Sequence, residues 1–293
     1  MSMNLTGTGV AIVTPFHEDG SIHFEQLRTL INHLIDNGIN YIVSLGTTGE
    51  SVTLTKEEKV KLVRQTIEFV DGRIPVVVGA GGNNTASVID EIKLFDSISG
   101  IDAYLSVAPY YSKPSQKGFY AHYAAVAQAT ERAIILYNVP GRTGKNMEAA
   151  TALKLGRDFE NIIAIKEAGN NMVQSQYLVK HKPEDFFVVS GDDDLLLGQM
   201  ACGFDGVISV VANAYPKHWS DMVYQASENN YDSARQINYA LLDFVKYAFA
   251  ENNPAGIKCA LKHLGLCNDY LRLPLVNVEA ELETKIEAFV KQM

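Results

Sequence analysis

The stretch IIAIKEA, at residues 162–168, is a short apolar run that carries a lysine near its end. A run of Ile and Ala with little polar alternation is typical of a strand that is buried on both faces, as the strands of a parallel sheet are. Because side chains alternate along a strand, we expect the even-numbered residues Ile162, Ala164 and Lys166 on one face and the odd-numbered residues on the other. The ammonium group of Lys166 then has no obvious solvated side.

Lys166 requires an explanation, because an unpaired buried charge is costly. Such a lysine reaches an acidic partner, extends to solvent at the strand end, or loses its proton and becomes a nucleophile. The nearest acid in the sequence, Glu167, should point to the opposite face. The position therefore favours Schiff-base chemistry with a ketone over a structural ion pair.

Strands and helices alternate along the chain on both sides of this stretch. We expect strands at residues 10–14, 41–45, 75–78, 103–108, 133–137, 162–168, 186–189 and 207–211. We expect helices at residues 24–35, 56–70, 86–95, 118–129, 147–155, 171–179 and 217–228, and one more after the acidic run at 192–194. Eight such units over about 230 residues predict an α/β fold of the (β/α)8 TIM-barrel type, whose usual size is ~250 residues.

The alternation stops near residue 229, and only helical patterns follow, at residues 231–249, 254–264 and 278–290. We therefore expect two domains, a (β/α)8 barrel catalytic domain at residues 1–229 and a C-terminal helical domain at residues 230–293. A three-helix appendage of this length buries little surface alone. We expect it to pack against the barrel or against a neighbouring subunit.

Composition and charge narrow the class of partner. A net charge of -9 and a pI near 5.3 disfavour nucleic acid or an anionic membrane, since both select for clustered Lys and Arg. The N-terminus lacks a signal-peptide pattern, and no run approaches the ~20 apolar residues of a membrane span. We therefore expect a cytoplasmic protein.

The three cysteines are Cys202, Cys259 and Cys267. They are far apart and form no zinc-like pattern with histidine, so we interpret them as buried thiols.

In a barrel of this type, the active site forms where the strands end. The second expected strand ends in GTTG at residues 46–49, a turn whose N–H groups and hydroxyls suit a carboxylate or phosphate, although many such turns only lead into helices. The fifth ends in Tyr137 and is followed by Arg142, which can hold a carboxylate with two hydrogen bonds. A tyrosine near a neutral lysine can move a proton, although a strand-end tyrosine more often packs and a loop arginine is usually solvated.

Metal and hydrolase chemistry have little support in the sequence. The run SGDDD at residues 190–194 could bind a metal ion, but consecutive acids also suit the start of a helix, where carboxylates favour the dipole. The histidines are dispersed, without an H-x-x-x-H pair or a Ser/His elbow. We therefore expect no metal site and no separate cofactor.

Four motifs together resemble the dihydrodipicolinate synthase and N-acetylneuraminate lyase superfamily over the whole chain. They are GTTGE at 46–50, YNVPGRTG at 137–144, IKEA at 165–168 and SGDD at 190–193. The resemblance implies a class I pyruvate-dependent aldolase or a related lyase, commonly a homotetramer. It also implies that Lys166 forms a covalent imine with pyruvate.

The resemblance assigns roles to further residues. It implies that Thr47 and Thr48 hold the carboxylate of pyruvate and that Tyr137 is the central proton donor and acceptor. A proton relay would join Thr48, Tyr137 and a Tyr111 that reaches in across a dimer interface. The backbone of Gly191 and Ile208 would line the same pocket.

Arg142 separates two branches of the superfamily. In the synthases, an arginine in this signature receives the carboxylate of aspartate semialdehyde, whereas the sialic acid lyases usually lack it. The synthase form implies condensation of pyruvate with L-aspartate 4-semialdehyde to 4-hydroxy-tetrahydrodipicolinate, in lysine and diaminopimelate biosynthesis. One alternative is a pyruvate-dependent aldolase acting on N-acetylneuraminate or a 2-keto-3-deoxy acid. Another is a non-catalytic barrel that only binds a keto acid.

Lysine regulation is a point on which the chain departs from the superfamily pattern. Lysine-inhibited members bind lysine at a dimer interface through histidines after the Thr-Thr motif and a glutamate in the third helix. This chain has Lys56, Lys59 and Ser87 at those positions, although Asn83 and Tyr110 are retained. Two added positive charges and one lost negative charge oppose a cationic ligand. We therefore predict weak or absent inhibition by lysine.

Overall fold

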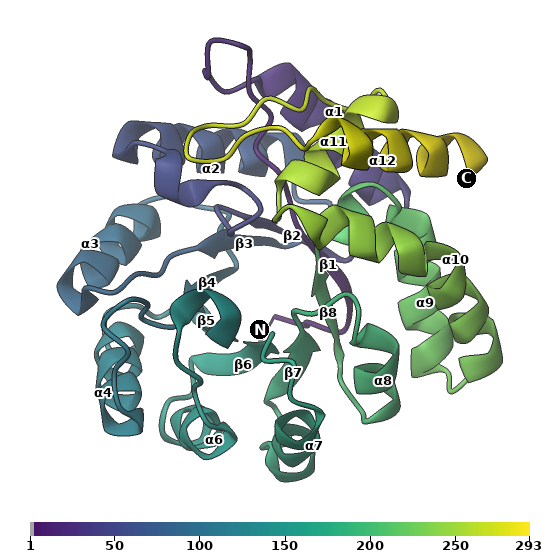
Figure 1. Cartoon of the computed structure of the whole chain (residues 1–293). Helices are drawn as coiled ribbons and strands as arrows, with labels where there is room; N and C mark the ends of the chain where they lie inside the picture. Colours follow the sequence, from purple (N-terminus) through teal and green to yellow (C-terminus); the bar gives the residue numbers. More distant parts are fainter. Residues whose placement is uncertain (1–2) are drawn as a thin grey trace.

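The computed structural model describes residues 3–293 and, within them, a closed barrel of eight parallel strands. The strands are β1 (Gly7–Ala11), β2 (Tyr41–Ser44), β3 (Val76–Gly79), β4 (Ala103–Val107), β5 (Ala133–Asn138), β6 (Ile162–Glu167), β7 (Phe187–Ser190) and β8 (Gly206–Ser209). They are ordered around the barrel as in the chain, and β8 pairs with β1 to close it. Figure 1 shows the strands at the centre with helices around them. The predicted (β/α)8 fold is confirmed.

Helices connect the strands and cover the outside of the barrel. They are α1 (Phe24–Asp36), α2 (Lys56–Val70), α3 (Thr85–Asp96), α4 (Gln116–Ala127), α6 (Ala149–Asp158), α7 (Met172–His181), α8 (Leu196–Ala201) and α9 (Pro216–Ser227). Three short helices lie in loops after strands: η1 (Ser51–Thr53), α5 (Pro140–Thr143) and η2 (Val211–Asn213). The acidic run at 192–194 precedes α8 as a turn, whereas the sequence predicted that it opens the helix.

Two buried apolar clusters hold the barrel together. The larger lies between the strands and the surrounding helices and includes Ile42, Leu136 and Trp219. The smaller fills the barrel interior and includes Ala164 and Ile208. Because each large apolar side chain that is fully buried contributes about 1.5–3 kcal/mol, these two layers supply the main force that closes the barrel.

The stretch at 162–168 forms β6 as predicted, but with a change of face in its first half. The β5–β6 register places Ile134 opposite Ile162 and Ile135 opposite Ala164, so Ile163 is an extra residue in a β-bulge. As a result, Ile163 packs with the interior cluster and Ile162 with the outer cluster, the reverse of our prediction. A bulge changes the alternation at one point. From Ala164 onward the predicted faces are correct.

The first strand begins and ends three residues earlier than the predicted span at 10–14. Its glycines lower the strand propensity, which is why the sequence pattern placed the start of the strand too late. Gly9 is required by packing, because a Cβ there would lie 2.1 Å from Cε2 of Tyr41. Beyond the strand, the N–H of Val13 donates to Oδ1 of Asn213 at 3.2 Å, so this buried segment is paired by a side chain.

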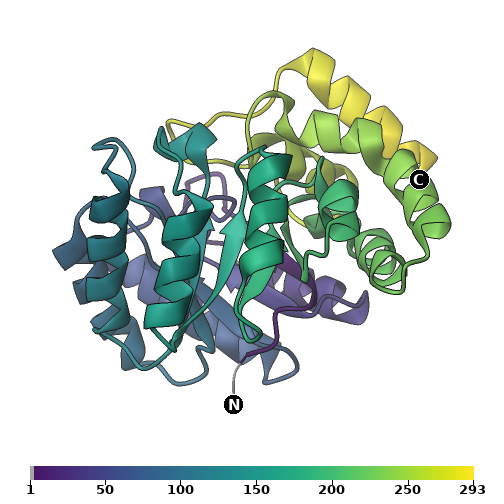
Figure 2. The ribbon, with the colours of Figure 1, turned by 90° about the horizontal axis from the view of Figure 1, so that it is seen from below.

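The C-terminal segment forms α10 (Tyr231–Ala250), α11 (Ala255–His263) and α12 (Ala280–Gln292), and α10 packs on α9 of the barrel. In Figure 2 the yellow C-terminal helix lies at the end of the molecule opposite the marked N-terminus. The division into domains at residues 229 and 230 stays a prediction. Among residues 3–293, no helix is both long and apolar enough to cross a membrane.

Candidate active site

Lys166 lies near the end of β6 and points into the barrel interior, where it is 4% exposed. In the sheet it is opposite Tyr137 of β5 and Val189 of β7. Its Nζ lies 4.5 Å from the centroid of the Tyr137 ring. A Cβ on Gly191 would lie 2.8 Å from Cε of Lys166, so the glycine leaves space for the lysine side chain. The amine is thus held within the barrel beside a phenol.

A cavity of about 230 Å³ opens above this amine at the carboxyl ends of the strands. Its polar lining residues are Thr47, Thr48, Tyr137, Arg142, Lys166, Asn170, Asp192 and Asn253. The cavity is small, and it combines one amine, one guanidinium and several hydroxyls. These groups suit a small keto acid or a similar anion.

Two larger hollows, of about 910 and 790 Å³, lie at the opposite end of the barrel, where the strands begin. The first is lined by residues such as Asp102, Arg132 and Asn161, and none of its described lining residues belongs to the candidate site. In (β/α)8 enzymes the chemistry takes place where the strands end. The smaller cavity is therefore the candidate active site.

The environment of Lys166 leaves its amine neutral, and so nucleophilic, in a fraction of the molecules. Burial lowers the pKa of Lys166 to about 8, while the carboxylates of Asp193 and Asp192 raise it and Arg142 lowers it. With such a pKa, roughly one amine in ten is neutral at pH 7. A neutral amine attacks a carbonyl carbon, whereas an ammonium group does not.

Tyr137 is buried, and its hydroxyl stays protonated at neutral pH. Burial raises the pKa of Tyr137 to about 12, and Asp192 acts in the same direction. The charge of Arg142 and a hydrogen bond with the Thr47 side chain lower it. A neutral phenol beside a neutral amine can donate a proton to an oxygen that leaves as water.

The turn at residues 46–49 presents polar groups to the same cavity. The N–H groups of Gly49 and Glu50 donate to the carbonyls of Gly46 and Thr47, at 3.1 and 3.0 Å. In the described chain, no acceptor pairs with the N–H of Thr47 or Thr48. Free N–H groups of this kind hold a carboxylate well.

The C-terminal segment completes the site through Asn253. Nδ2 of Asn253 donates to Oγ1 of Thr48 at 2.9 Å, and both side chains are buried. Oδ1 of Asn253 is buried without a hydrogen-bond partner in the described chain. Sequence reasoning missed Asn253, because only the fold brings this residue, between α10 and α11, next to the turn after β2.

A buried ion pair anchors the turn at residues 46–49 to the C-terminal segment. Glu50 Oε1 lies 2.5 Å from Nζ of Lys258, and both side chains are fully buried. Glu50 Oε2 accepts from the N–H of Arg272 at 3.0 Å. Lys258 also donates to the carbonyl of Tyr270 at 2.8 Å. The turn that carries Thr47 and Thr48 is therefore tied to the C-terminal segment.

Glu167 takes no part in pairing Lys166, as the sequence predicted. It points away from the cavity and accepts hydrogen bonds from Nδ2 of Asn138 at 3.0 and 3.1 Å and from Nε2 of Gln174 at 3.0 Å. Burial raises the pKa of Glu167 to about 7. Within β6, the Lys166 amine therefore has no carboxylate as a hydrogen-bond partner.

Six of the predicted site residues line the cavity: Thr47, Thr48, Tyr137, Arg142, Lys166 and Gly191. Ile208 packs in the interior cluster instead, and Val210 lines the cavity on that side. Tyr111 does not line the cavity of its own chain. It is 90% exposed and has a left-handed φ of 68°. Its predicted role requires a second copy of the chain and stays a prediction.

The region expected to contact a regulatory lysine lies next to the site. Lys59 and Tyr110 line a neighbouring cavity of about 480 Å³, which also contacts Tyr137. Nζ of Lys59 forms an ion pair with Glu91 at 2.7 Å. A cation is therefore already present in this cavity and is already paired.

Comparison with known proteins agrees with this geometry. Residues 4–293 match the model of the dihydrodipicolinate synthetase family. The chain is 47% identical over 291 residues to the 4-hydroxy-tetrahydrodipicolinate synthase of Parabacteroides distasonis, with 99% of this chain and 98% of that protein covered. The crystal structure of dihydrodipicolinate synthase from Aquifex aeolicus superimposes with a TM-score of 0.95, at 41% identity and with 98% of each chain covered. The chain belongs to the dihydrodipicolinate synthetase family.

Proposed function

We propose that this protein is a lyase that condenses pyruvate with L-aspartate 4-semialdehyde to give 4-hydroxy-tetrahydrodipicolinate. The observation that carries the proposal is the buried Lys166, with its lowered pKa, beside the protonated Tyr137. The cavity is small enough to select a short keto acid. Relatives that match along the whole chain bear the name of this synthase, which supports the same reaction.

The first step joins pyruvate to the enzyme. The neutral amine of Lys166 attacks the ketone carbon, and the ketone oxygen leaves as water after it has accepted protons. Tyr137 donates one proton and later recovers it. The free N–H groups and hydroxyls of Thr47 and Thr48 hold the pyruvate carboxylate, so the carbonyl carbon faces the amine.

The next steps form two bonds and release the enzyme. Loss of a methyl proton turns the imine into an enamine, whose carbon attacks the aldehyde carbon of the second substrate. Arg142, at the mouth of the cavity, binds the carboxylate of that substrate. The amino group of the second substrate then attacks the imine carbon, closes the ring and displaces the Lys166 amine. One water is released overall, and no separate cofactor takes part.

A second copy of the chain would complete the proton relay. Tyr111 is exposed and held in a strained left-handed conformation, as suits a side chain that reaches into a neighbouring subunit. We place it in a relay with Thr48 and Tyr137 of the neighbour, within a homotetramer. Tyr111→Phe should lower the turnover rate without changing the assembly state, as measured by sedimentation.

The alternative substrates are distinguished by Arg142. A sugar-acid aldolase has no need for a guanidinium at this position, and a barrel that only binds a keto acid has no need for the lowered pKa of Lys166. A coupled assay should detect condensation with aspartate semialdehyde and no cleavage of N-acetylneuraminate or 2-keto-3-deoxy acids. Cleavage of a sugar acid without activity on the semialdehyde would replace the proposal.

A further inference from the structure

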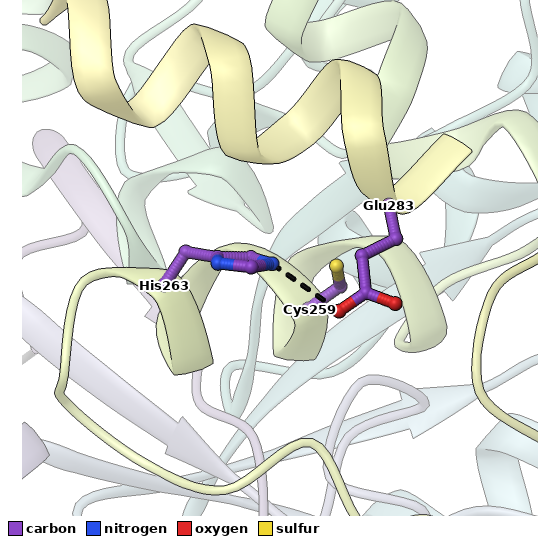
Figure 3. A group of neighbouring side chains, drawn as sticks. All are labelled: Cys259, His263 and Glu283. Atoms are coloured by element: carbon purple, nitrogen blue, oxygen red, sulfur yellow. Dashed lines mark ion pairs between the residues drawn. The ribbon is translucent and has the colours of Figure 1, made fainter. Parts of the chain in front are cut away.

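We propose that Cys259, His263 and Glu283 bind a divalent transition-metal ion of the Zn²⁺ type between two C-terminal helices. One ligand atom from each residue, the thiol sulfur, an imidazole nitrogen and a carboxylate oxygen, lies within 4.8 Å of the other two. Figure 3 shows the three side chains converging on one point between α11 and α12. This location is separate from the cavity that holds Lys166.

The backbone already presents the three groups in a suitable way. Cys259 and His263 are four residues apart on α11 and therefore share one face of the helix. Glu283, in the first turn of α12, approaches from the other side. Tetrahedral zinc, with bonds of about 2.0–2.3 Å, holds its ligand atoms about 3.5 Å apart. Side-chain rotations that move the ligand atoms by about 1 Å would therefore close the site.

The ligand atoms are not fully used by the protein. The Nε2 atom of His263 is buried and has no hydrogen bond within the described chain. Its closest acid is Glu283, at 3.4 Å, a contact that gains a charge only when the imidazole is protonated. Cys259 is 1% exposed, and its thiol is not part of a disulfide. A metal ion would satisfy all three groups at once.

Charge and chemistry select the kind of ion. A thiolate and a carboxylate together neutralise a divalent cation, and a sulfur ligand with an imidazole suits Zn²⁺ better than Mg²⁺ or Ca²⁺. Lys262 pairs with Glu283 at 3.0 Å, but it also pairs with Asp269 at 3.0 Å. Asp269 therefore keeps the ammonium group neutralised when Glu283 turns an oxygen toward the metal.

The site would fasten α12 to α11 and take no direct part in the reaction. Three protein ligands leave a fourth position for water. Glu283 is 36% exposed, so solvent reaches the site. We expect the ion to exchange with chelators and to raise the stability of the C-terminal helices by binding only the folded chain.

Cobalt titration of the chelator-treated full-length protein tests the proposal. We expect about one Co²⁺ per chain, a thiolate-to-cobalt absorption band in the near ultraviolet, and loss of the band when Zn²⁺ is added. Cys259→Ser should abolish the band, and His263→Gln should weaken binding by at least about tenfold, a loss seen even for residues that only support a metal ligand. Cys202→Ser, at another cysteine, is the matched control and should bind normally.

Thermal unfolding, followed by calorimetry with and without Zn²⁺, provides a second measurement. Zn²⁺ should raise the melting temperature of the wild-type chain and of Cys202→Ser, but not of His263→Gln or Glu283→Gln, whose changed side chains are partly exposed. Folding of each variant is checked by circular dichroism before titration. Absence of a sulfur-to-cobalt band in the wild type, or a band that persists in folded Cys259→Ser, would overturn the proposal. Equal Zn²⁺ stabilisation of the wild type and both partly exposed variants would also overturn it.

Discussion

Nζ of Lys258 lies 2.5 Å from Oε1 of Glu50, and neither side chain is exposed to solvent. This pair joins α11 to the residue that follows the turn carrying Thr47 and Thr48. Removing one partner of a buried ion pair leaves an uncompensated charge and costs about 3–5 kcal/mol. The C-terminal helices are thus coupled to the site through a contact whose loss would strongly destabilise the folded protein.

The first prediction concerns this ion pair. Lys258→Met should lower the free energy of unfolding by about 3–5 kcal/mol and raise the KM for pyruvate, since Glu50 is left charged and the turn loses its anchor. Urea denaturation and initial rates measure the two effects. The double variant Lys258→Met with Glu50→Gln should recover much of the stability, because no unpaired charge remains. Equal stability of Lys258→Met and wild type would refute the role of this pair.

The second prediction concerns Tyr137. Tyr137→Phe keeps the ring over which the Lys166 amine lies but removes the proton that the hydroxyl transfers. The turnover number should fall by about 10²–10⁴-fold, the usual contribution of general acid–base catalysis. Tyr120→Phe, at a surface hydroxyl bonded to Asp158, is the control and should retain full activity. A fall of less than about tenfold in Tyr137→Phe would remove this residue from the proton path.

The third prediction concerns Arg142. Arg142→Ala should raise the KM for aspartate semialdehyde and lower kcat/KM by about 10–100-fold, since hydrogen bonds to a charged group are worth about 1.5–3 kcal/mol. Trapping of pyruvate on Lys166 should continue in this variant. Arg64→Ala, at an exposed arginine of α2, should leave both constants unchanged. If Arg142→Ala changed only the KM for pyruvate, the assignment of Arg142 to the second substrate would be wrong.

The fourth prediction follows from the pKa of Lys166. Because only the neutral amine reacts, the rate of imine formation should rise with pH and level off above about 8, the pKa in the folded protein. The free energy of unfolding should also rise between pH 8 and pH 10.5, where the unfolded lysine binds a proton and the folded one does not. Stopped-flow measurements with pyruvate give the rate profile. A rate that keeps rising up to about pH 10, without levelling off, would contradict a lowered pKa, since a lysine with the ordinary pKa of 10.5 behaves in that way.

The fifth prediction concerns feedback by lysine. Lys59 lines the neighbouring cavity as a cation paired with Glu91, so free lysine should inhibit weakly or not at all. Steady-state rates across a lysine titration test this. A combined change of Lys56→His, Lys59→His and Ser87→Glu should increase sensitivity to lysine. Inhibition of the unchanged protein at nanomolar to micromolar lysine would contradict the prediction.

Local patterns were sufficient to predict the barrel and most of the cavity. Apolar runs bounded by turns predict strands, and in a parallel barrel their ends meet, so Lys166, Tyr137 and the turn at 46–49 could be placed together from order alone. The bulge at Ile163 could not be predicted, because it depends on the register with β5. The same holds for β1, where the ring of Tyr41 explains Gly9 and the side chain of Asn40 explains Gly7.

Contacts between distant segments were the part that the sequence did not reveal. Asn253 and Lys258 lie more than 200 positions from Thr48 and Glu50, and no periodicity connects them. Cys259 and His263 do have a readable signal, a four-residue spacing on a helix. Cys259 and Cys267 are buried thiols as predicted, whereas Cys202 is only partly buried. The third group of the proposed metal site, Glu283, comes from another helix.

The central claim is that Lys166 forms a covalent imine with pyruvate. The most direct measurement is borohydride reduction in the presence of pyruvate, followed by mass mapping of the peptides. The account predicts one added group of the mass of reduced pyruvate on the peptide that contains Lys166, and no added group in Lys166→Arg. No adduct in the wild-type protein, or an adduct on a different lysine such as Lys258, would contradict the account.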